Sequence, residues 1–318
     1  MSNVTIRELA AACGVSIGTV SKALNCSERI SGETARRIRE KAEELGYVGN
    51  HAARALSSRG RRVALVLPAA SPHLECYRRA FREMEPTLLS YGLFSAEVAP
   101  EEADAYDAVV AHAAMASRLS LGEGKLAVLF GGRAPSFHSL AEILPDYRVG
   151  GRLAAQFLAF ATGGGAAAIL TTRRGVAGED EAVRGFRELS AKLGIPVTAV
   201  LECGDNPRSI SAEVRRLLAA APRLRGLFVT GPITSAVVAT LGESRRRLSV
   251  VASDFTRPAQ EALRNGAVSA LLYPSPERQV TLSLSTLLSA LTGQPSATTR
   301  TVRQELVLKS NLESYIIP

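Results

Sequence analysis

The chain has 318 residues, of which 46% are hydrophobic and 21% are charged, and its formal net charge is +8. This composition is ordinary for a globular protein and excludes a disordered chain, a collagen-like chain and a disulfide scaffold. At ~150 residues per domain, the length corresponds to about two domains with enough material for a sizeable core.

The positive charge is concentrated at the N-terminus. Residues 1–62 hold eleven Lys and Arg against six Asp and Glu, a net charge of +5, whereas the other 256 residues carry +3. A small basic region beside a nearly neutral remainder favours nucleic acid as a partner. Because 33 of the 38 basic residues are Arg, a compositional bias explains part of the excess equally well.

Several classes of protein are not expected from the sequence. No apolar run approaches the ~18–20 residues of a membrane helix, and Arg7 and Glu8 interrupt the segment that a signal peptide would keep apolar. We therefore expect a cytoplasmic protein. The sequence has no P-loop, nucleophile elbow or dinucleotide-binding glycine motif, and its histidines lack ligand spacing, so no enzyme, cofactor or metal site is expected. The cysteines form no C-x-x-C pair and are expected as reduced thiols: Cys13, Cys26, Cys76 and Cys203.

The first 46 residues predict three short helices. Thr5-Ile6-Arg7-Glu8 is a capping box for a helix that ends at Gly14. Ser16 is positioned to cap a second helix, from Ile17 to about Leu24. Residues 25–29 predict a turn, and Ser31 is positioned to cap a third helix that ends at Gly46. The expected inward residues are Ile6, Leu9, Ala10, Cys13, Val15, Val20, Leu24, Ile38, Ala42 and Leu45.

Three such helices with a tight turn between the first two predict a helix-turn-helix, whose second helix enters the major groove. The outward residues at its start are Ile17, Gly18 and Lys22. Lys22 can donate to guanine O6 or N7, and Ile17 can contact a thymine methyl. Gly18 has no side chain, so it either permits close approach of the helix to the DNA or leaves one base position without a contact.

Short polar side chains around these helices are suited to phosphate oxygens. They are Thr5, Ser16, Thr19, Ser21, Asn25 and Ser31. Ser16 and Ser31 can equally be helix caps alone, although a helix N-terminus that is capped also attracts anions.

The N-terminal sequence resembles the LacI family of transcription regulators. The resemblance is carried by residues 4–10, 14–16, 19–25, 45–47 and 50–56. It implies that 50–58 is a hinge helix that orders on operator DNA, and that Leu56 is an apolar wedge in the minor groove. An ordinary linker with a core Leu is the alternative. The resemblance adds Tyr47, Asn50, Ala53 and Leu56 to the expected DNA contacts.

From Val63 onward, short β-type runs alternate with helical ones, which predicts parallel sheets covered by helices. The predicted strands are 63–67, 93–98, 108–111, 126–130, 167–171, 197–202, 226–230, 248–253, 268–273 and 300–308. The expected fold class is an all-α helix-turn-helix head plus an α/β core of two parallel-sheet subdomains, similar to periplasmic binding proteins. Ligands of such folds bind at the carboxyl ends of strands, between the halves.

The core also resembles the LacI family, more diffusely, over residues 144–155, 184–187 and 250–255. The resemblance implies that Asp254 contacts an effector. Residues 258–276 are more similar to the sugar-binding-protein branch, in which a polar residue often stands at the position of Tyr273, and this adds Tyr273 to the expected effector contacts. Asp254 can equally be an N-cap for the helix from Thr256. Two departures put sugar binding in doubt, because Ala182 stands where the family has Arg, and Gly231-Pro232 replaces an Asn-Asp pair. Residues 100–125 are short and Ala-rich for this fold. The two arginines at 173–174 and the three at 245–247 are interpreted as solvated loops rather than a second nucleic-acid site.

We expect a head at 1–48, a hinge and linker at 49–61 and a core at 62–318. Within the core, one subdomain is expected at about 62–160 with 275–298 returning to it, and the other at about 163–272 with the C-terminal strand. The expected function is an effector-responsive repressor that binds a pseudo-palindromic operator as a homodimer, since no Leu heptad follows the last strand. The expected effector is a sugar or related metabolite; a non-sugar effector, a protein co-regulator or no effector, and a solute-binding protein without a DNA role, are the alternatives.

Overall fold

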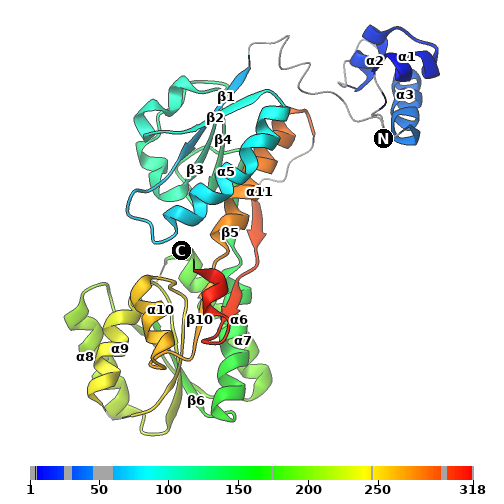
Figure 1. The fold of residues 1–318 in the computed structure, drawn as a ribbon. Helices are drawn as coiled ribbons and strands as arrows, with labels where there is room; N and C mark the ends of the chain where they lie inside the picture. The colour runs from blue at the N-terminus through cyan, green and yellow to red at the C-terminus, as the bar shows by residue number, and fades with distance from the viewer. Residues whose placement is uncertain are drawn as a thin grey trace.

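The structure is a computed structural model that describes residues 4, 6–24, 31–45, 60–173, 175–244, 246–294 and 299–316. It contains a small helical head and an α/β core built on two six-stranded sheets (Figure 1). None of the helices in the described ranges is long and apolar enough to span a membrane.

The head consists of α1 (Ile6–Cys13), α2 (Ile17–Leu24) and α3 (Gly32–Glu44), which confirms the three predicted helices. Gly14 ends α1 with φ of +63°, a left-handed conformation that glycine adopts without strain. Leu9, Val20 and Ile38 are fully buried, one from each helix. The head therefore has its own small apolar core.

The first sheet of the core has the strand order β11-β5-β4-β3-β1-β2, and all of its pairings are parallel. Two long helices, α5 (Leu74–Ser90) and α11 (Pro276–Leu291), pack on one face. Two short 3-10 helices, η1 (Pro100–Ala105) and η2 (Ala113–Arg118), cover the other. This explains why residues 100–125 are short and Ala-rich. The strands are β1 (Arg61–Val66), β2 (Leu93–Glu97), β3 (Ala108–His112), β4 (Leu126–Phe130), β5 (Ala141–Pro145) and β11 (Thr299–Val302).

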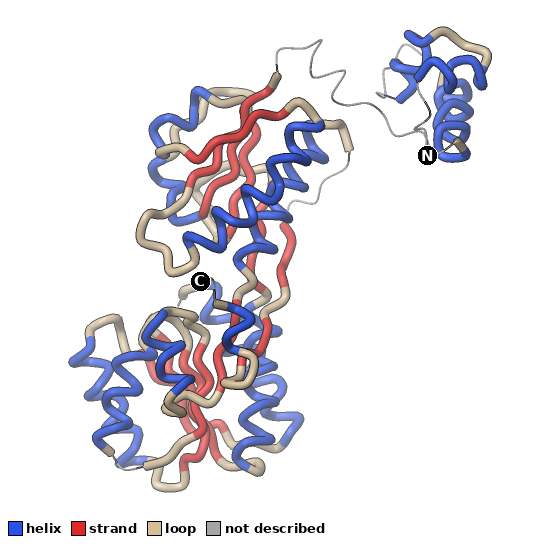
Figure 2. The backbone as a smooth tube through the Cα atoms, viewed as in Figure 1, coloured by secondary structure: helices blue, strands red, loops and turns tan. Residues whose placement is uncertain are grey.

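The second sheet has the order β12-β10-β9-β8-β6-β7, with one antiparallel pairing, between β10 and β12. Helices α6 (Tyr147–Thr162) and α7 (Ala177–Leu193) pack on one face. Helices α8 (Pro207–Ala220), α9 (Thr234–Glu243) and α10 (Arg257–Arg264) pack on the other, which gives three layers (Figure 2). The strands are β6 (Ala166–Thr171), β7 (Val197–Glu202), β8 (Leu224–Val229), β9 (Ser249–Ala252), β10 (Ala270–Tyr273) and β12 (Glu305–Val307), and η3 (Leu312–Tyr315) follows the last strand.

The structure corrects three sequence expectations. Strand β5 was not predicted, because Glu142 and Pro145 interrupt its five-residue apolar pattern. The predicted strand 300–308 is two strands in different sheets, and the chain crosses between the sheets at Arg303 and Gln304. Helix α6 was expected to precede the boundary between the halves, but its apolar face packs on the second sheet.

The two sheets are connected by three chain crossings, at 145–147, 273–276 and 302–305. Two of them are linked, because Ser275 donates from Oγ to the carbonyl oxygen of Arg303. Ser275 has φ of +52°, the left-handed region that a non-glycine residue rarely adopts. The crossing segments are therefore held together at the boundary between the sheets.

Candidate nucleic-acid interface and ligand cleft

The start of α2 is organised by Ser16. Its hydroxyl oxygen accepts from the backbone N–H of Thr19 at 3.1 Å and is 2.9 Å from the Thr19 hydroxyl. Ser31 does the same for α3, where it accepts from the N–H of Thr34 at 3.3 Å. Both predicted caps are confirmed. Both serines are exposed, so capping leaves them accessible to an anion in solvent.

Among the described side chains of α2, Ile17 is an apolar one that the core of the head does not bury. Val20 and Ala23 are buried in the head, whereas the Ile17 side chain is 45% exposed. Gly18 is exposed beside it, and an added Cβ would have only the Ser16 hydroxyl nearby, at 3.7 Å. The first turn of α2 therefore presents an apolar side chain, a bare backbone position and two hydroxyls to solvent.

The other predicted DNA contacts cannot be placed in this surface. The backbone of Ser21 and Lys22 belongs to α2. The remaining residues lie outside the described part of the chain: Thr5, Asn25, Tyr47, Asn50, Ala53 and Leu56. Their roles stay predictions, as does the capping box at Thr5.

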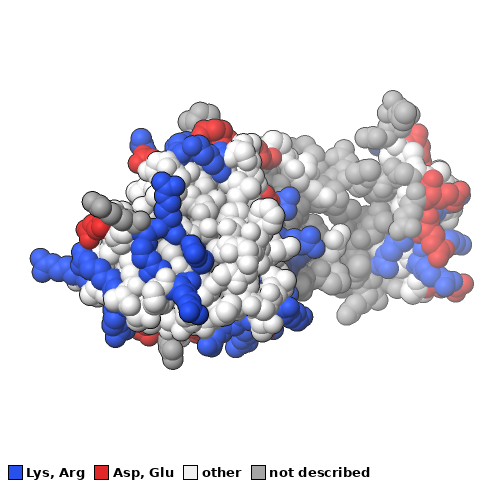
Figure 3. Space-filling view, turned by 90° about the horizontal axis from the view of Figure 1, so that it is seen from below, with Lys and Arg blue, Asp and Glu red and all other residues white. Residues whose placement is uncertain are grey.

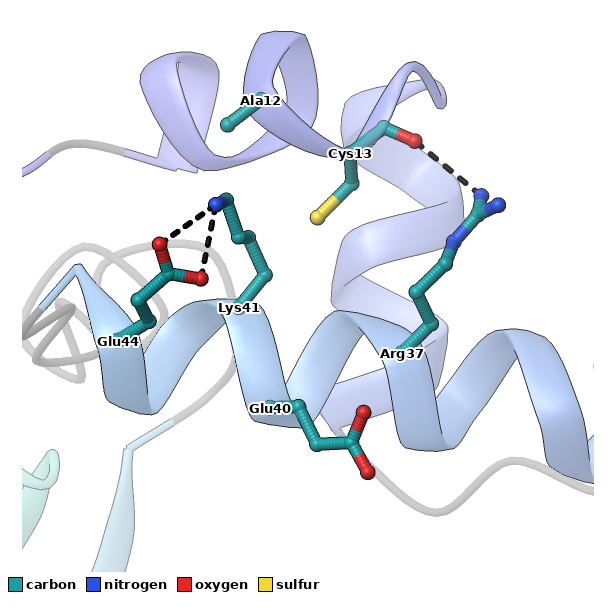
Figure 4. A pocket seen from close by; sticks show the side chains of 6 residues that line it. All are labelled: Ala12, Cys13, Arg37, Glu40, Lys41 and Glu44. Atoms are coloured by element: carbon teal, nitrogen blue, oxygen red, sulfur yellow. Dashed lines mark hydrogen bonds and ion pairs between the residues drawn. The ribbon is translucent and has the colours of Figure 1, made fainter.

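A groove lies between α1 and α3, and the side chains that line it link the two helices (Figure 4). Arg37 donates to the carbonyl oxygen of Cys13 at 3.2 Å, which satisfies a free carbonyl at the end of α1. Lys41 pairs with Glu44 at 2.8 Å. Since these charges already have partners within the head, the groove holds α3 against α1 and is a poor site for a ligand.

The core contains a cleft of about 1100 Å³ between the two sheets. Its lining comes from loops at the carboxyl ends of strands in both sheets, including Gly131 after β4, Gly231 after β8 and Asp254 after β9. The crossing residues Pro145 to Tyr147 form part of its floor. This is the position at which folds of this type bind ligands.

Asp254, the predicted effector contact, lines this cleft. One of its oxygens accepts from the backbone N–H of Thr256 at 3.2 Å and from the Thr256 hydroxyl at 2.8 Å. The other oxygen is 3.4 Å from the N–H of Thr234. The carboxylate thus organises the loop before α10 and also lines the cleft. It is not the N-cap of α10, because that position is occupied by Thr256.

Glu179 is a cleft residue that the sequence did not single out. It accepts hydrogen bonds from the hydroxyls of Thr171, Thr172 and Thr230, and from the Thr172 N–H at 2.8 Å. The carboxylate therefore ties the first turn of α7 to the ends of β6 and β8.

Tyr273 is buried below the cleft and is absent from its lining. Its hydroxyl donates to the Glu277 carboxylate at 2.7 Å, and Glu277 also pairs with Arg79 at 2.8 Å. Burial raises the pKa of Tyr273, and the hydrogen bond to Glu277 adds to that rise. The side chain links β10 to α5 and α11 across the boundary between the sheets.

Two histidines lie close together although 39 residues separate them. His73 and His112 flank the ring of Tyr77, with ring centroids 6.2 and 5.8 Å away. Burial lowers the pKa of each to about 4; Glu277 and Asp254 partly oppose this at His73, and the neighbouring His73 adds to it at His112. The Nδ1 atom of His112 accepts from the N–H of Ala114. This neutral pair lies beside the cleft, and the described residues form no cluster suited to a metal ion.

Helices α6 and α7 beside the cleft touch through their backbones. An added Cβ on Gly151 would stand 1.9 Å from the carbonyl oxygen of Ala182, and one on Gly185 would stand 2.0 Å from that of Arg148. Ala182 is buried in this contact. Ala182 also belongs to the lining of the cleft, so a small apolar side chain stands where the sequence comparison expects an Arg.

The chain is similar to known regulatory proteins in its N-terminal part. Residues 5–50 match the model of the family described as bacterial regulatory proteins, lacI family. A maltose regulon regulatory protein, MalI of Vibrio furnissii, is 35% identical over 97 residues, 30% of this chain and 71% of that protein. The transcriptional regulator GntR of Pseudomonas aeruginosa is 44% identical over 66 residues, 20% of this chain but only 19% of its own length.

Solved structures extend the likeness to the core. The regulator CelR, solved with cellobiose, is 22% identical with a TM-score of 0.59, and covers 96% of this chain and 99% of its own. The arabinose-binding protein AraP of Geobacillus stearothermophilus is 16% identical with a TM-score of 0.70, and covers 81% and 99%. These likenesses establish the fold: a helix-turn-helix head on a core like that of sugar-binding proteins.

The head thus matches a family of bacterial regulatory proteins, and the core has the fold of the solved structures named above. The chain belongs to the lacI family of bacterial regulatory proteins.

Proposed function

We propose that this protein is a sequence-specific DNA-binding transcription regulator in the cytoplasm, acting as a repressor. It binds a pseudo-palindromic operator as a homodimer. The observation that carries the proposal is the first turn of α2, where Ile17 is 45% exposed while Val20 is fully buried on the same helix. An apolar side chain presented there is suited to a thymine methyl, with Lys22 as the second base-reading residue.

DNA affinity tests this proposal directly. Binding to duplex DNA should weaken steeply with salt, with a slope near −0.9 per phosphate contacted, whereas a flat response would contradict it. Leu56→Ala should weaken operator binding far more than binding to random DNA. The inserted Leu side chain stabilises the complex only where the duplex bends to admit it. Equal operator affinity in parent and variant would refute the wedge.

We also propose that a small effector, a sugar or related metabolite, occupies the cleft and changes the angle between the sheets. The fold likeness to proteins solved with cellobiose or named for arabinose supports this class. The three crossings would carry the change toward the linker. To shift DNA binding, the effector must bind one arrangement more tightly than the other.

One observation favours the alternative of a non-sugar effector, a protein co-regulator or none. Every charged side chain in the cleft already has a partner within the chain: Glu179 and Asp254 hold threonines, and Arg148 pairs with Glu188. A sugar would have to displace these bonds. A thermal-shift screen of sugars, polyols and sugar phosphates decides, because a ligand at ~100 times its Kd stabilises by about 2.7 kcal/mol.

A further inference from the structure

The second sheet has a strongly basic edge at the end remote from the cleft. We propose that this edge, formed by Lys192, Arg223, Arg225 and Arg247, binds the phosphate backbone of a second DNA duplex without regard to sequence. We call it the basal surface. It goes beyond the proposed function, although the choice of DNA as the polyanion rests on that function.

The sheet register brings these residues together. Arg225 lies on β8, where Gly226 pairs with Ser249 of β9, so Arg247 precedes the neighbouring strand by two residues. Adjacent strands are about 4.8 Å apart. An added Cβ on Gly165 would stand 2.7 Å from Cγ of Arg225, so that side chain lies across the turn into β6. Lys192 lies in the last turn of α7, which leads into β7 on the other side of β6.

The basal surface has no acidic counterpart of its own. The turns that enter the strands here, at 163–165, 193–196, 221–223, 246–248 and 265–269, contain no Asp or Glu. Its three arginines are exposed and, within the described ranges, have no carboxylate within ion-pair distance. Seen from this end, Lys and Arg gather with few Asp and Glu among them (Figure 3). The basal surface therefore carries positive charge that no nearby acidic side chain in the described part of the chain neutralises.

Helix ends account for only part of this charge. Helices α6 to α9 end at this edge, and cations stabilise helix C-termini. Arg246 performs that task, since its guanidinium donates to the carbonyl oxygens of Leu218, Ala221, Pro222 and Leu224. Arg223, Arg225 and Arg247 donate to no carbonyl among the described residues. Arg246 thus fixes the loops, and the other three remain free for a partner.

Duplex DNA is the polyanion that these features fit. Three of the four cations of the basal surface are arginines, and the planar guanidinium group matches the geometry of a phosphate. The chain enters the core from the head at β1, whose N-terminal end lies on the side of the first sheet away from the cleft. The basal surface lies at the other end of the core. A molecule bound through its head would hold a second duplex there rather than the same one.

A bridging assay tests the inference. A biotinylated duplex on beads is incubated with the full chain, and then with a dye-labelled duplex of unrelated sequence. The parent should retain the labelled duplex. The variant Arg223→Ala/Arg225→Ala/Arg247→Ala should capture at least tenfold less labelled duplex than the parent. The amount of the variant protein retained on the beads should stay within twofold of the parent's. The salt slope of capture should fall by about 3, since each phosphate contact contributes ~0.9.

The matched control removes three exposed arginines elsewhere in the core, Arg173→Ala/Arg187→Ala/Arg208→Ala, with the same change of net charge. It should capture as the parent does. Equal loss in both variants would overturn the inference, because net charge alone would then act. Bead binding without capture would overturn it too, and would leave an acidic protein surface as the occupant. A parent that binds no duplex at all would remove the proposed function as well.

Discussion

The head and the core of this protein hold their polar side chains differently. In the head, the hydroxyls and the exposed Ile17 at the start of α2 have only local partners and face solvent. In the core cleft, Glu179 and Asp254 are tied to threonines from other elements. The head therefore carries recognition groups ready for a partner. The cleft is an organised scaffold, in which a ligand competes with bonds already made.

If this comparison holds, the two regions should fail separately. The largest difference is expected in acid. The folded pKa of about 4 for His73 and His112 lies below the ordinary 6.5, so the unfolded chain binds more protons between these values. The free energy of unfolding of the core should therefore fall as pH drops from about 6.5 toward 4, by on the order of 2–4 kcal/mol at pH 5 for the pair.

The head has no histidine in residues 1–48, so it should lack this slope. Urea unfolding at pH 7.5 and pH 5, followed by tyrosine fluorescence for the core and amide exchange in α3 for the head, measures both. His73→Gln and His112→Gln should each flatten the core slope. A slope that survives both substitutions, or that appears equally in the head, would contradict the assignment.

The next effect tests the backbone contact between α6 and α7. Gly151→Ala places a Cβ 1.9 Å from the Ala182 carbonyl oxygen. The helices must separate, which should lower the free energy of unfolding of the core by about 3 kcal/mol. Gly242→Ala is the matched control, because it lies in α9 with nothing within 4 Å of the added Cβ. It should stabilise by up to about 1 kcal/mol.

Urea unfolding of both variants gives the two values. The same sign for both would mean that α6 and α7 do not touch as described. Exchange protection in the head should be unchanged in either variant, and a parallel loss there would break the comparison between the two regions.

The difference between the regions also explains what the sequence could predict. The head follows from caps and spacing within a few residues, so Ser16, Ser31 and Gly14 marked its helices correctly. The cleft depends on residues that are distant in the chain. The packing of α5 on β3 brings His73 and His112 together, and Glu179 of α7 contacts Thr230 at the end of β8. No local sequence pattern predicts contacts between residues so far apart in the chain.

Errors in the core have the same origin. Strand β5 is a short segment whose Glu142 accepts from the Ala134 N–H, so a charged residue is satisfied by a loop that the pattern does not specify. The split of 300–308 depends on Gln304, which is buried where the chain crosses between sheets and lies against Gly150. The sequence predicts a solvated loop at 245–247, because only the strand register shows that Arg247, two residues before β9, comes next to Arg225 on β8.

A smaller effect addresses base reading by the head. Lys22→Ala should reduce the preference for operator over random DNA by about 1–3 kcal/mol, because a donor to guanine distinguishes bases. The core should be unaffected, with the same unfolding midpoint and the same thermal shift with any ligand found. Competition binding with operator and random duplexes measures the preference. An equal loss on both duplexes would make Lys22 a phosphate contact.

The smallest effect separates capping from DNA contact within the head. Ser16→Ala and Ser31→Ala each remove a side-chain cap, at 3.1 and 3.3 Å, and should each cost the head about 1 kcal/mol. If Ser16 also touches a phosphate, its variant should weaken operator and random DNA by the same factor, since phosphate contacts carry no sequence information. Amide exchange in α2 and α3 gives the stability, and DNA titration gives the affinity. A change in operator preference would show instead that the cap positions Ile17 and Lys22 for base reading, which would make recognition by the head depend on internal bonds, as the cleft does.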